Sequence, residues 1–230
     1  MNGAICELFD NGKFDEIVQD EWPSVWSENT LYYNILDRCR TMNFYDLRRA
    51  LNTAMTTWDF EVAVHFKPSW AYNEPADLKI FFKSSEEDEL FNRKPSVLAY
   101  AYFPGQGNLD GIIVFNDDYI WTLNGKSIKA KDAYDKGWID KFVDPDNQIR
   151  TYNLIQVLMH ELGHSLGLKH DVSGNNDGSD VMDAFYDGTR HDLSERDIYR
   201  IRLKYPIRIF SRWLWYGRLK RWLAARKRRY

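Results

Sequence analysis

The chain has 230 residues, of which 44% are hydrophobic and 16% aromatic, a composition that can bury one substantial core. Its two cysteines exclude a disulfide framework, and the sequence contains no internal repeat and no low-complexity tract. The 31 basic and 34 acidic residues nearly cancel to a net charge of −3, but they are unevenly distributed. We therefore divide the chain into an N-terminal extension (1–25), a main domain (26–206) and a basic C-terminal tail (207–230).

The N-terminal extension is acidic and lacks the apolar stretch of a secretory signal. Its acids include Glu7, Asp10, Asp15, Glu16, Asp20 and Glu21. We expect a solvated helical extension here. A short pro-segment that covers a functional site with an Asp or Glu is the alternative.

The main domain mixes short apolar runs with helical patterns, which predicts an α+β layout. We predict strands at residues 31–35, 61–66, 76–82, 98–103 and 111–116. Helices are predicted over about 43–58 and about 150–166, separated in part by a Gly-, Asp- and Lys-rich loop at 123–149. The second helix would bury one face formed by Leu154, Val157, Leu158 and Leu162. Ser194 and Asp197 resemble a capping box that starts a last helix.

The tail carries nine Lys or Arg residues and no acid, so the first 206 residues have a net charge of −12. On a helix, one of its faces would carry Trp215, Leu219, Trp222 and Leu223. Such a basic, tryptophan-rich pattern favours an anionic membrane surface or a groove on a protein partner. Packing of the tail on the protein's own body is an equal alternative, and nucleic-acid binding through residues 225–229 is the less favoured one. The tail is too short to span a bilayer.

Residues 160–170 spell H-E-L-G-H-S-L-G-L-K-H, which places three imidazoles and a carboxylate at the spacing of a metal site. Residues i and i+4 share one face of a helix, so His160 and His164 can bind one ion. Gly167 can end the helix with a positive φ, and the chain then delivers His170 as the third ligand. Three protein ligands leave a fourth position for water, which indicates a catalytic zinc. Glu161 would lie beside that water and accept its proton.

Met182 lies 12 residues past His170, in the segment S-D-V-M-D-A-F-Y. This arrangement resembles the Met-turn of the metzincin peptidases, and specifically of the matrixins, the matrix metalloproteinase-like branch. Further resemblance to matrixins is carried by residues 54–58, 76–82, 98–105, 115–122 and 193–205. The likeness covers about residues 26–205. It implies a zincin-like fold with a twisted mixed sheet of about five strands, three main helices and the Met-turn.

The chain also departs from the matrixin pattern at its other metal sites. Matrixins usually carry a structural zinc, but Tyr100 and either Ile113 or Val114 stand where histidines would be expected. Lys83, Ser84 and Ser85 likewise replace the usual H-x-D. Asn116 and Tyr119 disrupt the calcium-binding acids, while Asp110, Asp117 and Asp118 leave a weak calcium site open. We therefore predict one zinc, no structural zinc, and weak or absent calcium binding.

The features that control matrixin activation are altered as well. The propeptide pattern P-R-C-G-x-P-D is missing, since Cys39 has other neighbours. Arg196 stands where matrixins have an aspartate that pairs with the freed N-terminus, and it would repel an ammonium group. Asp171 resembles the adamalysin branch rather than the matrixins. Cys6 and Cys39 are expected to be free thiols, with a single bridge as the alternative.

The resemblance implies a zinc-dependent endopeptidase that acts on protein or peptide substrates, with Glu161 as general base and then general acid. Substrate would lie extended along the strand that contains Ala99, Tyr100, Ala101 and Tyr102. Tyr186 resembles the wall of the specificity pocket, with Leu158 and Val181 nearby. The resemblance favours an apolar residue after the scissile bond, although Asp183 and Ala184 depart from the usual residues there.

The alternative function is an inactive zinc-binding module that docks to a membrane or protein partner through the basic tail. Glu161 argues against it, because a structural zinc site needs no base. We expect a monomer. Matrixins are typically extracellular, but no signal peptide is visible in this sequence.

Overall fold

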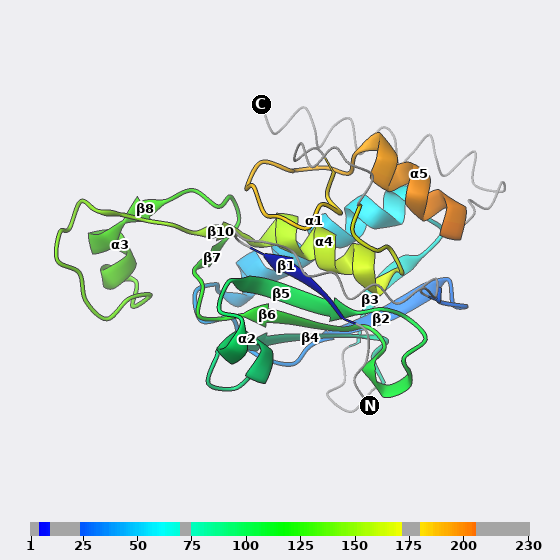
Figure 1. Cartoon of the computed structure of the whole chain (residues 1–230), viewed down its shortest axis with the longest axis horizontal. Helices are drawn as coiled ribbons and strands as arrows, with labels where there is room; N and C mark the ends of the chain where they lie inside the picture. The colour runs from blue at the N-terminus through cyan, green and yellow to red at the C-terminus, as the bar shows by residue number, and fades with distance from the viewer. Residues whose placement is uncertain (1–4, 10–23, 70–74, 172–179, 206–230) are drawn as a thin grey trace.

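The computed structural model describes residues 5–9, 24–69, 75–171 and 180–205, and Figure 1 shows how they are arranged. The basic tail and most of the N-terminal extension lie outside these residues, so the roles expected for them stay predictions. Among the described residues, no helix is both long enough and apolar enough to cross a membrane.

A mixed six-stranded sheet forms the base of the domain (Figure 1). Its strand order is β1-β5-β6-β4-β2-β3, with bounds Ile5–Phe9, Val97–Tyr102, Ile112–Asn116, Leu78–Lys83, Thr30–Ile35 and His65–Pro68. The four strands β6, β4, β2 and β3 run parallel to one another, whereas β5 is antiparallel to β6 and β1 is antiparallel to β5. Five of these strands correspond to the predicted ones. The sixth, β1, lies in a segment for which we expect a helix, so that expectation is wrong for residues 5–9.

Two long helices, α1 (Phe44–Glu61) and α4 (Leu154–Ser165), pack against each other and on one face of the sheet (Figure 1). Helix α1 begins at Asn43, whose side chain accepts a hydrogen bond from the Asp46 amide. Its buried stripe ends at Trp58, and the indole Nε1 of Trp58 donates to the Met159 carbonyl at 2.9 Å. This bond fixes α1 against the middle of α4, where the metal motif begins.

A second, smaller apolar cluster lies beneath the short helix α2 (Glu89–Arg93) and contains Phe91, Val97, Tyr100 and Val114. Neighbouring β6 residues Ile113 and Phe115 belong to the main core instead. The alternation follows from the strand period of two, which sends successive side chains to opposite faces. The sheet therefore separates the main core from the α2 cluster.

Three predicted boundaries differ from the structure, each for a local reason. The strand predicted at 61–66 is β3, which starts at His65 because α1 continues to Glu61. The helix predicted from residue 150 starts at Leu154, since Tyr152 and Asn153 form strand β10 beside β7 (Trp121–Thr122). The loop predicted at 123–149 contains helix α3 (Ala130–Asp135) and the paired strands β8 (Ile128–Lys129) and β9 (Gln148–Ile149).

The last helix, α5 (Glu195–Lys204), begins with the predicted capping box. Ser194 accepts from the Asp197 amide, and the Asp197 carboxylate accepts from the Ser194 amide. Together these elements confirm the predicted zincin-like α+β fold.

Candidate metal and catalytic site

Helix α4 presents the metal motif because both of its ends are defined by local hydrogen bonds. At its start, the Asn153 side chain accepts from the amides of Ile155 and Gln156. At its end, Gly167 has a φ of 89°, as the sequence predicts. The Gly167 amide donates to the His164 carbonyl at 2.8 Å, and the Leu168 amide to the Gly163 carbonyl at 2.9 Å. This pair of bonds is a Schellman motif, which turns the chain back toward the helix.

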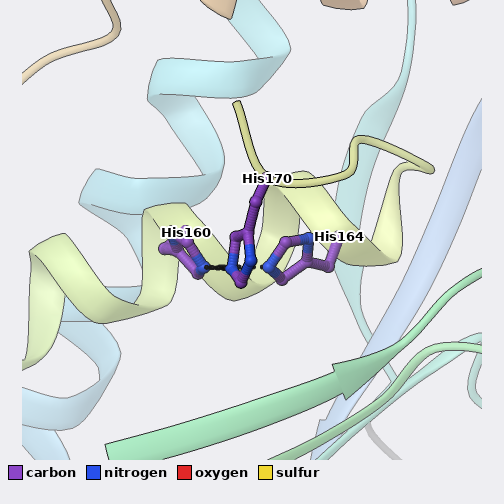
Figure 2. Close-up of side chains that lie close together, drawn as sticks. All are labelled: His160, His164 and His170. Carbon is purple, nitrogen blue, oxygen red and sulfur yellow. Dashed lines mark hydrogen bonds between the residues drawn. The ribbon is translucent and has the colours of Figure 1, made fainter. Parts of the chain in front are cut away.

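The turn brings the three predicted ligands together, as Figure 2 shows. The Nε2 atoms of His160 and His164 are 2.8 Å apart, and those of His160 and His170 are 3.1 Å apart. Among the described residues, this is the group of three or more His, Cys, Asp or Glu side chains placed to hold one metal ion.

Two backbone carbonyls determine which nitrogen of the helical histidines faces the centre of the site. Nδ1 of His160 lies 2.6 Å from the Val181 oxygen, and Nδ1 of His164 lies 2.6 Å from the Leu168 oxygen. Because a carbonyl oxygen only accepts hydrogen bonds, each Nδ1 carries the hydrogen and each Nε2 carries a lone pair. Two facing lone pairs cannot hydrogen-bond to each other. A cation bound by all three Nε2 atoms would satisfy them, so the donor set fits a zinc ion.

The histidines are also electrostatically suited to bind a metal. Burial, together with the neighbouring histidines, lowers the pKa of His160 and His170 well below the usual value. Burial lowers the pKa of His164 to about 4, even though its bond to the Leu168 carbonyl raises it. At neutral pH all three imidazoles are therefore uncharged, which is the form that coordinates a metal.

Glu161 and Met182 are both fully buried next to this centre. Glu161 follows the first ligand on α4, as the motif requires. Met182 lies in a turn at the start of the segment 180–190, and its sulfur packs against Gly163 so closely that a β-carbon at 163 would collide with it. The small residue inside the motif is therefore matched to the methionine beneath the helix.

Helix α5 fixes both the Met182 turn and the His170 segment. The buried Asp197 carboxylate accepts from the amides of Val181 and Met182 at 2.8 and 3.3 Å. Arg200 donates to the Lys169 carbonyl at 2.7 Å, and Arg196 pairs with Asp171 at 2.9 Å. Arg196 thus neutralises the acid that follows the third histidine, a contact that sequence reasoning missed.

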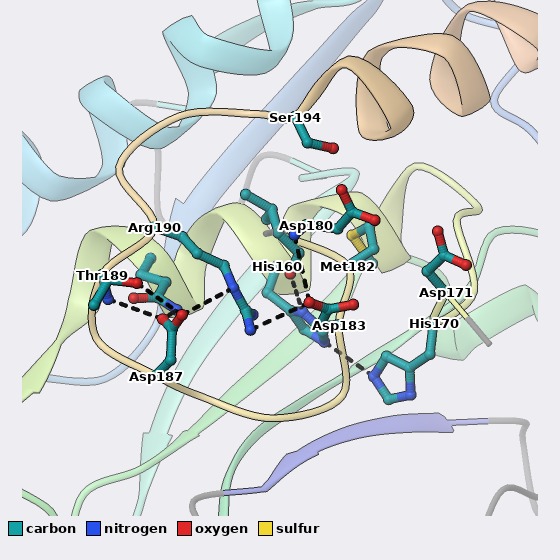
Figure 3. Close-up of polar contacts among 12 residues, drawn as sticks. His160, His170, Asp171, Asp180, Met182, Asp183, Asp187, Thr189, Arg190 and Ser194 are labelled. Atoms are coloured by element: carbon teal, nitrogen blue, oxygen red, sulfur yellow. Dashed lines mark hydrogen bonds and ion pairs between the residues drawn. The ribbon is translucent and has the colours of Figure 1, made fainter. Parts of the chain in front are cut away.

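A polar network follows the Met182 turn and lies near His160 (Figure 3). The Arg190 guanidinium is within 3.4 Å of Asp183 and 3.5 Å of Asp187, and the side chains of Arg190 and Asp183 are each only 4% exposed. Gln156, one turn before His160, donates to Asp187 at 3.0 Å. Burial raises the pKa of Asp183 to about 6, although Arg190 lowers it. The sequence points to Asp183 as unusual but predicts neither its ion pair with Arg190 nor the bond from Gln156 to Asp187, which joins two separate segments.

The predicted substrate-binding residues are divided between several environments. Ala99 and Ala101 face the main core, while Tyr100 and Tyr102 pack in or against the α2 cluster. Leu158 is buried in α4, and Val181 holds His160 through its carbonyl. The Tyr186 hydroxyl accepts from the Asn153 amide at 2.8 Å, which joins the segment after the Met182 turn to the start of α4.

The positions where the sequence departs from matrixin metal sites make other contacts. The Tyr100 hydroxyl donates to Asp88 at 2.7 Å within the α2 cluster, which also contains Val114. The Asp117 carboxylate accepts from the Arg40 amide, and the Arg40 guanidinium donates to the carbonyls of Asp117, Asp118 and Trp138. A guanidinium therefore supplies positive charge at the acidic loop. Cys39, beside Arg40, is a buried free thiol.

Comparison with known proteins gives consistent matches. The family model of the matrixins matches residues 25–206. Matrix metalloproteinase-18 of Xenopus laevis is 26% identical over 174 residues, which are 75% of this chain and 31% of that protein. Karilysin of Tannerella forsythia is 26% identical over 198 residues, covering 83% of this chain and 35% of that protein. Matrix metalloproteinase-26 of Homo sapiens is 30% identical over 185 residues, which cover 78% of this chain and 59% of that protein. The chain thus spans about a third of the length of the first two relatives.

Proposed function

The chain belongs to the matrixin family, and from this premise we propose that it is a zinc-dependent endopeptidase. The observation that carries the proposal is the convergence of three uncharged imidazoles, two of which have their Nε2 lone pairs oriented by carbonyl bonds. A buried carboxylate, Glu161, accompanies them on the same helix.

His160, His164 and His170 would hold the zinc ion through Nε2. When bound, zinc would supply a Lewis acid that polarises a peptide carbonyl and acidifies water. Glu161 would accept a proton from the attacking water and deliver it to the leaving amine. Its position in α4, one residue after His160, keeps the carboxylate next to the ligands throughout the reaction.

We further propose that the substrate lies extended along β5, at Ala99, Tyr100, Ala101 and Tyr102, and pairs with its main chain. Tyr186, Leu158 and Val181 would line the side of the site next to α4. The charged network of Arg190, Asp183 and Asp187 lies just beyond the Met182 turn. An exclusively apolar preference after the scissile bond therefore has less support than the family resemblance alone implies.

We propose that the protein uses one catalytic zinc, lacks the structural zinc, and binds calcium weakly or not at all. The hydrogen bond from Tyr100 to Asp88 and the packing of Val114 support the absence of the structural zinc, because these residues stand where its histidines would be expected. At the expected calcium loop, Arg40 provides a positive charge beside Asp117 and donates to three backbone carbonyls. Both arrangements satisfy polar groups with protein atoms instead of metal ions.

The test is cleavage of denatured casein by the purified chain and by Glu161→Ala, with zinc content measured on the same samples. We expect Glu161→Ala to lose at least about 100-fold in activity, since general acid–base catalysis contributes that much or more. It should keep about one zinc per chain, because Glu161 is not a ligand. His164→Ala should lose both zinc and activity. Equal cleavage by the parent and Glu161→Ala would contradict the role of Glu161 as the base, whereas zinc binding without cleavage by any form would favour latency or the inactive binding module.

A further inference from the structure

Strand β1 pairs with the outer edge of β5 along almost its whole length. The register runs from Ile5 opposite Tyr102 to Leu8 opposite Ala99, and an irregularity follows at Phe9, which lies opposite Val97. The other edge of β5 is occupied by β6. Both edges of β5 are therefore occupied within the chain.

The outer edge of β5 lies next to the candidate metal site. Phe103, the residue after β5, places its ring 5.6 Å from the His164 ring, and β1 itself contacts α4. Figure 1 shows β1 in dark blue alongside β5, near α4. An exposed edge strand at this place would offer free amides and carbonyls to an extended peptide. With β1 in place, β5 no longer offers that edge.

We propose that residues Ile5–Phe9 are a tethered occupant of the peptide-binding edge of β5, which an extended peptide must displace before it can bind. The proposal rests on the proposed function only in taking this edge as the substrate site. A tethered strand competes at a high effective concentration, because it never leaves the neighbourhood of β5. It contributes only five residues, and its register is interrupted at Phe9, so a longer peptide can replace it.

The first test locks the strand in place. Cys6 lies directly opposite Ala101, and opposed residues of antiparallel strands have Cα atoms about 4.5–5.5 Å apart, within the range of a disulfide. Oxidised Ala101→Cys should therefore form a Cys6 cross-link. The second native cysteine, Cys39, should compete little, because burial raises its thiol pKa to about 11. The matched control is Ala101→Cys with Cys6→Ser, which carries the same change in β5 but cannot form the bridge.

We expect the cross-linked protein to cleave denatured casein at least about tenfold more slowly than the reduced protein. The cross-link prevents β1 from leaving β5, so the state with an open β5 edge, which binds substrate, is no longer populated. A phosphine reductant should restore cleavage, and the control should respond to neither treatment. A cross-linked protein, verified by mass, that cleaves as fast as the reduced one would overturn the proposal. Failure of the cross-link to form would overturn it too, since β1 would then not lie in this register.

The second test opens the edge and measures binding without catalysis. Only every second residue of an antiparallel strand donates its backbone amide to a given neighbouring strand. The double change Cys6→Pro with Glu7→Pro therefore removes one amide that donates to β5, whichever of the two residues provides it. Cys6→Ala with Glu7→Ala is the matched control. Both are made in Glu161→Ala protein, and the probe is a fluorescein-labelled peptide of residues 3–11 that carries Cys6→Ser.

The double-proline protein should bind this probe at least about tenfold more tightly than the double-alanine protein. Equal affinities would contradict the proposal. The two proposals fail in different ways. If the probe binds as expected but no form of the protein cleaves casein, β1 still occupies the edge and the peptidase function is wrong.

Discussion

At the residue scale, the metal site depends on contacts that no motif names. The carbonyls of Val181 and Leu168 orient the rings of His160 and His164, and both belong to backbone outside the helix. Helix geometry makes the spacing of the histidines sufficient to predict which rings converge. It cannot predict the tautomers, because these depend on where the Schellman turn and the Met182 turn place two oxygens. Local sequence determines the first turn, but tertiary packing determines the second.

Tyr100 offers a test of how the protein manages without a histidine in β5. Tyr100→Phe keeps the ring in the α2 cluster but removes the hydrogen bond to Asp88. We expect the free energy of unfolding to fall by about 1.5–3 kcal/mol, the range for a hydrogen bond to a charged group. Urea denaturation of the two proteins measures the difference, and Tyr102→Phe on the same strand serves as the control. A Tyr100→Phe protein as stable as the parent would show that packing alone replaces the metal site.

At the element scale, α5 acts as a brace behind the site. Its first turn holds the Met182 turn through Asp197 and the Asp171 side chain through Arg196. Its middle holds the His170 segment through Arg200. The sequence predicts the start of α5 from the capping box, because that signal is local. It does not predict that the Asp197 carboxylate also accepts from Val181, since that contact crosses 16 residues. One carboxylate therefore caps a helix and anchors the turn beneath the ligands.

Asp197→Asn tests this brace. An amide in place of the carboxylate loses charge-assisted bonds and can direct donors at backbone amides in a fully buried position. We expect a loss of about 3 kcal/mol in the free energy of unfolding, and weaker zinc retention against a chelator. Glu195→Gln, an exposed acid in the same helical turn, should change neither quantity by more than about 0.5 kcal/mol. If the two variants behave alike, Asp197 only contributes charge near the helix start.

The elements that sequence patterns predict best are those with a strong period and a clear signal at their ends. Helix α1 and strands β4, β5 and β6 fall within a few residues of their predicted ranges. Residues 128–149 carry a short helix and a strand pair that are too short to generate a period. Strand β1 is equally hard to predict, because its five residues include Glu7, are followed by Asp10, and pair with β5, a partner about 90 residues away in sequence.

At the scale of the whole molecule, the metal site adds a further link between α4 and the segments after it, which hydrogen bonds already connect. His160 and His164 come from α4, which packs on α1 and the sheet. His170 comes from the segment that α5 holds. An ion bound by all three would therefore link the core helix to the C-terminal brace. Its removal would leave uncharged Nε2 atoms facing one another at 2.8 and 3.1 Å.

Zinc removal should accordingly destabilise the entire domain rather than loosen one loop. A ligand at about 1,000 times its dissociation constant stabilises the folded state by about 4 kcal/mol, which for a domain of this size is about 10 °C in Tm. We expect a chelator to lower the Tm of the parent by roughly this amount. Glu161→Ala should respond fully, because it keeps all three ligands, whereas His164→Ala should have a low Tm that the chelator does not change. A chelator response in His164→Ala equal to that of the parent would place the stabilising ion elsewhere, because His164 would then not be needed to hold it.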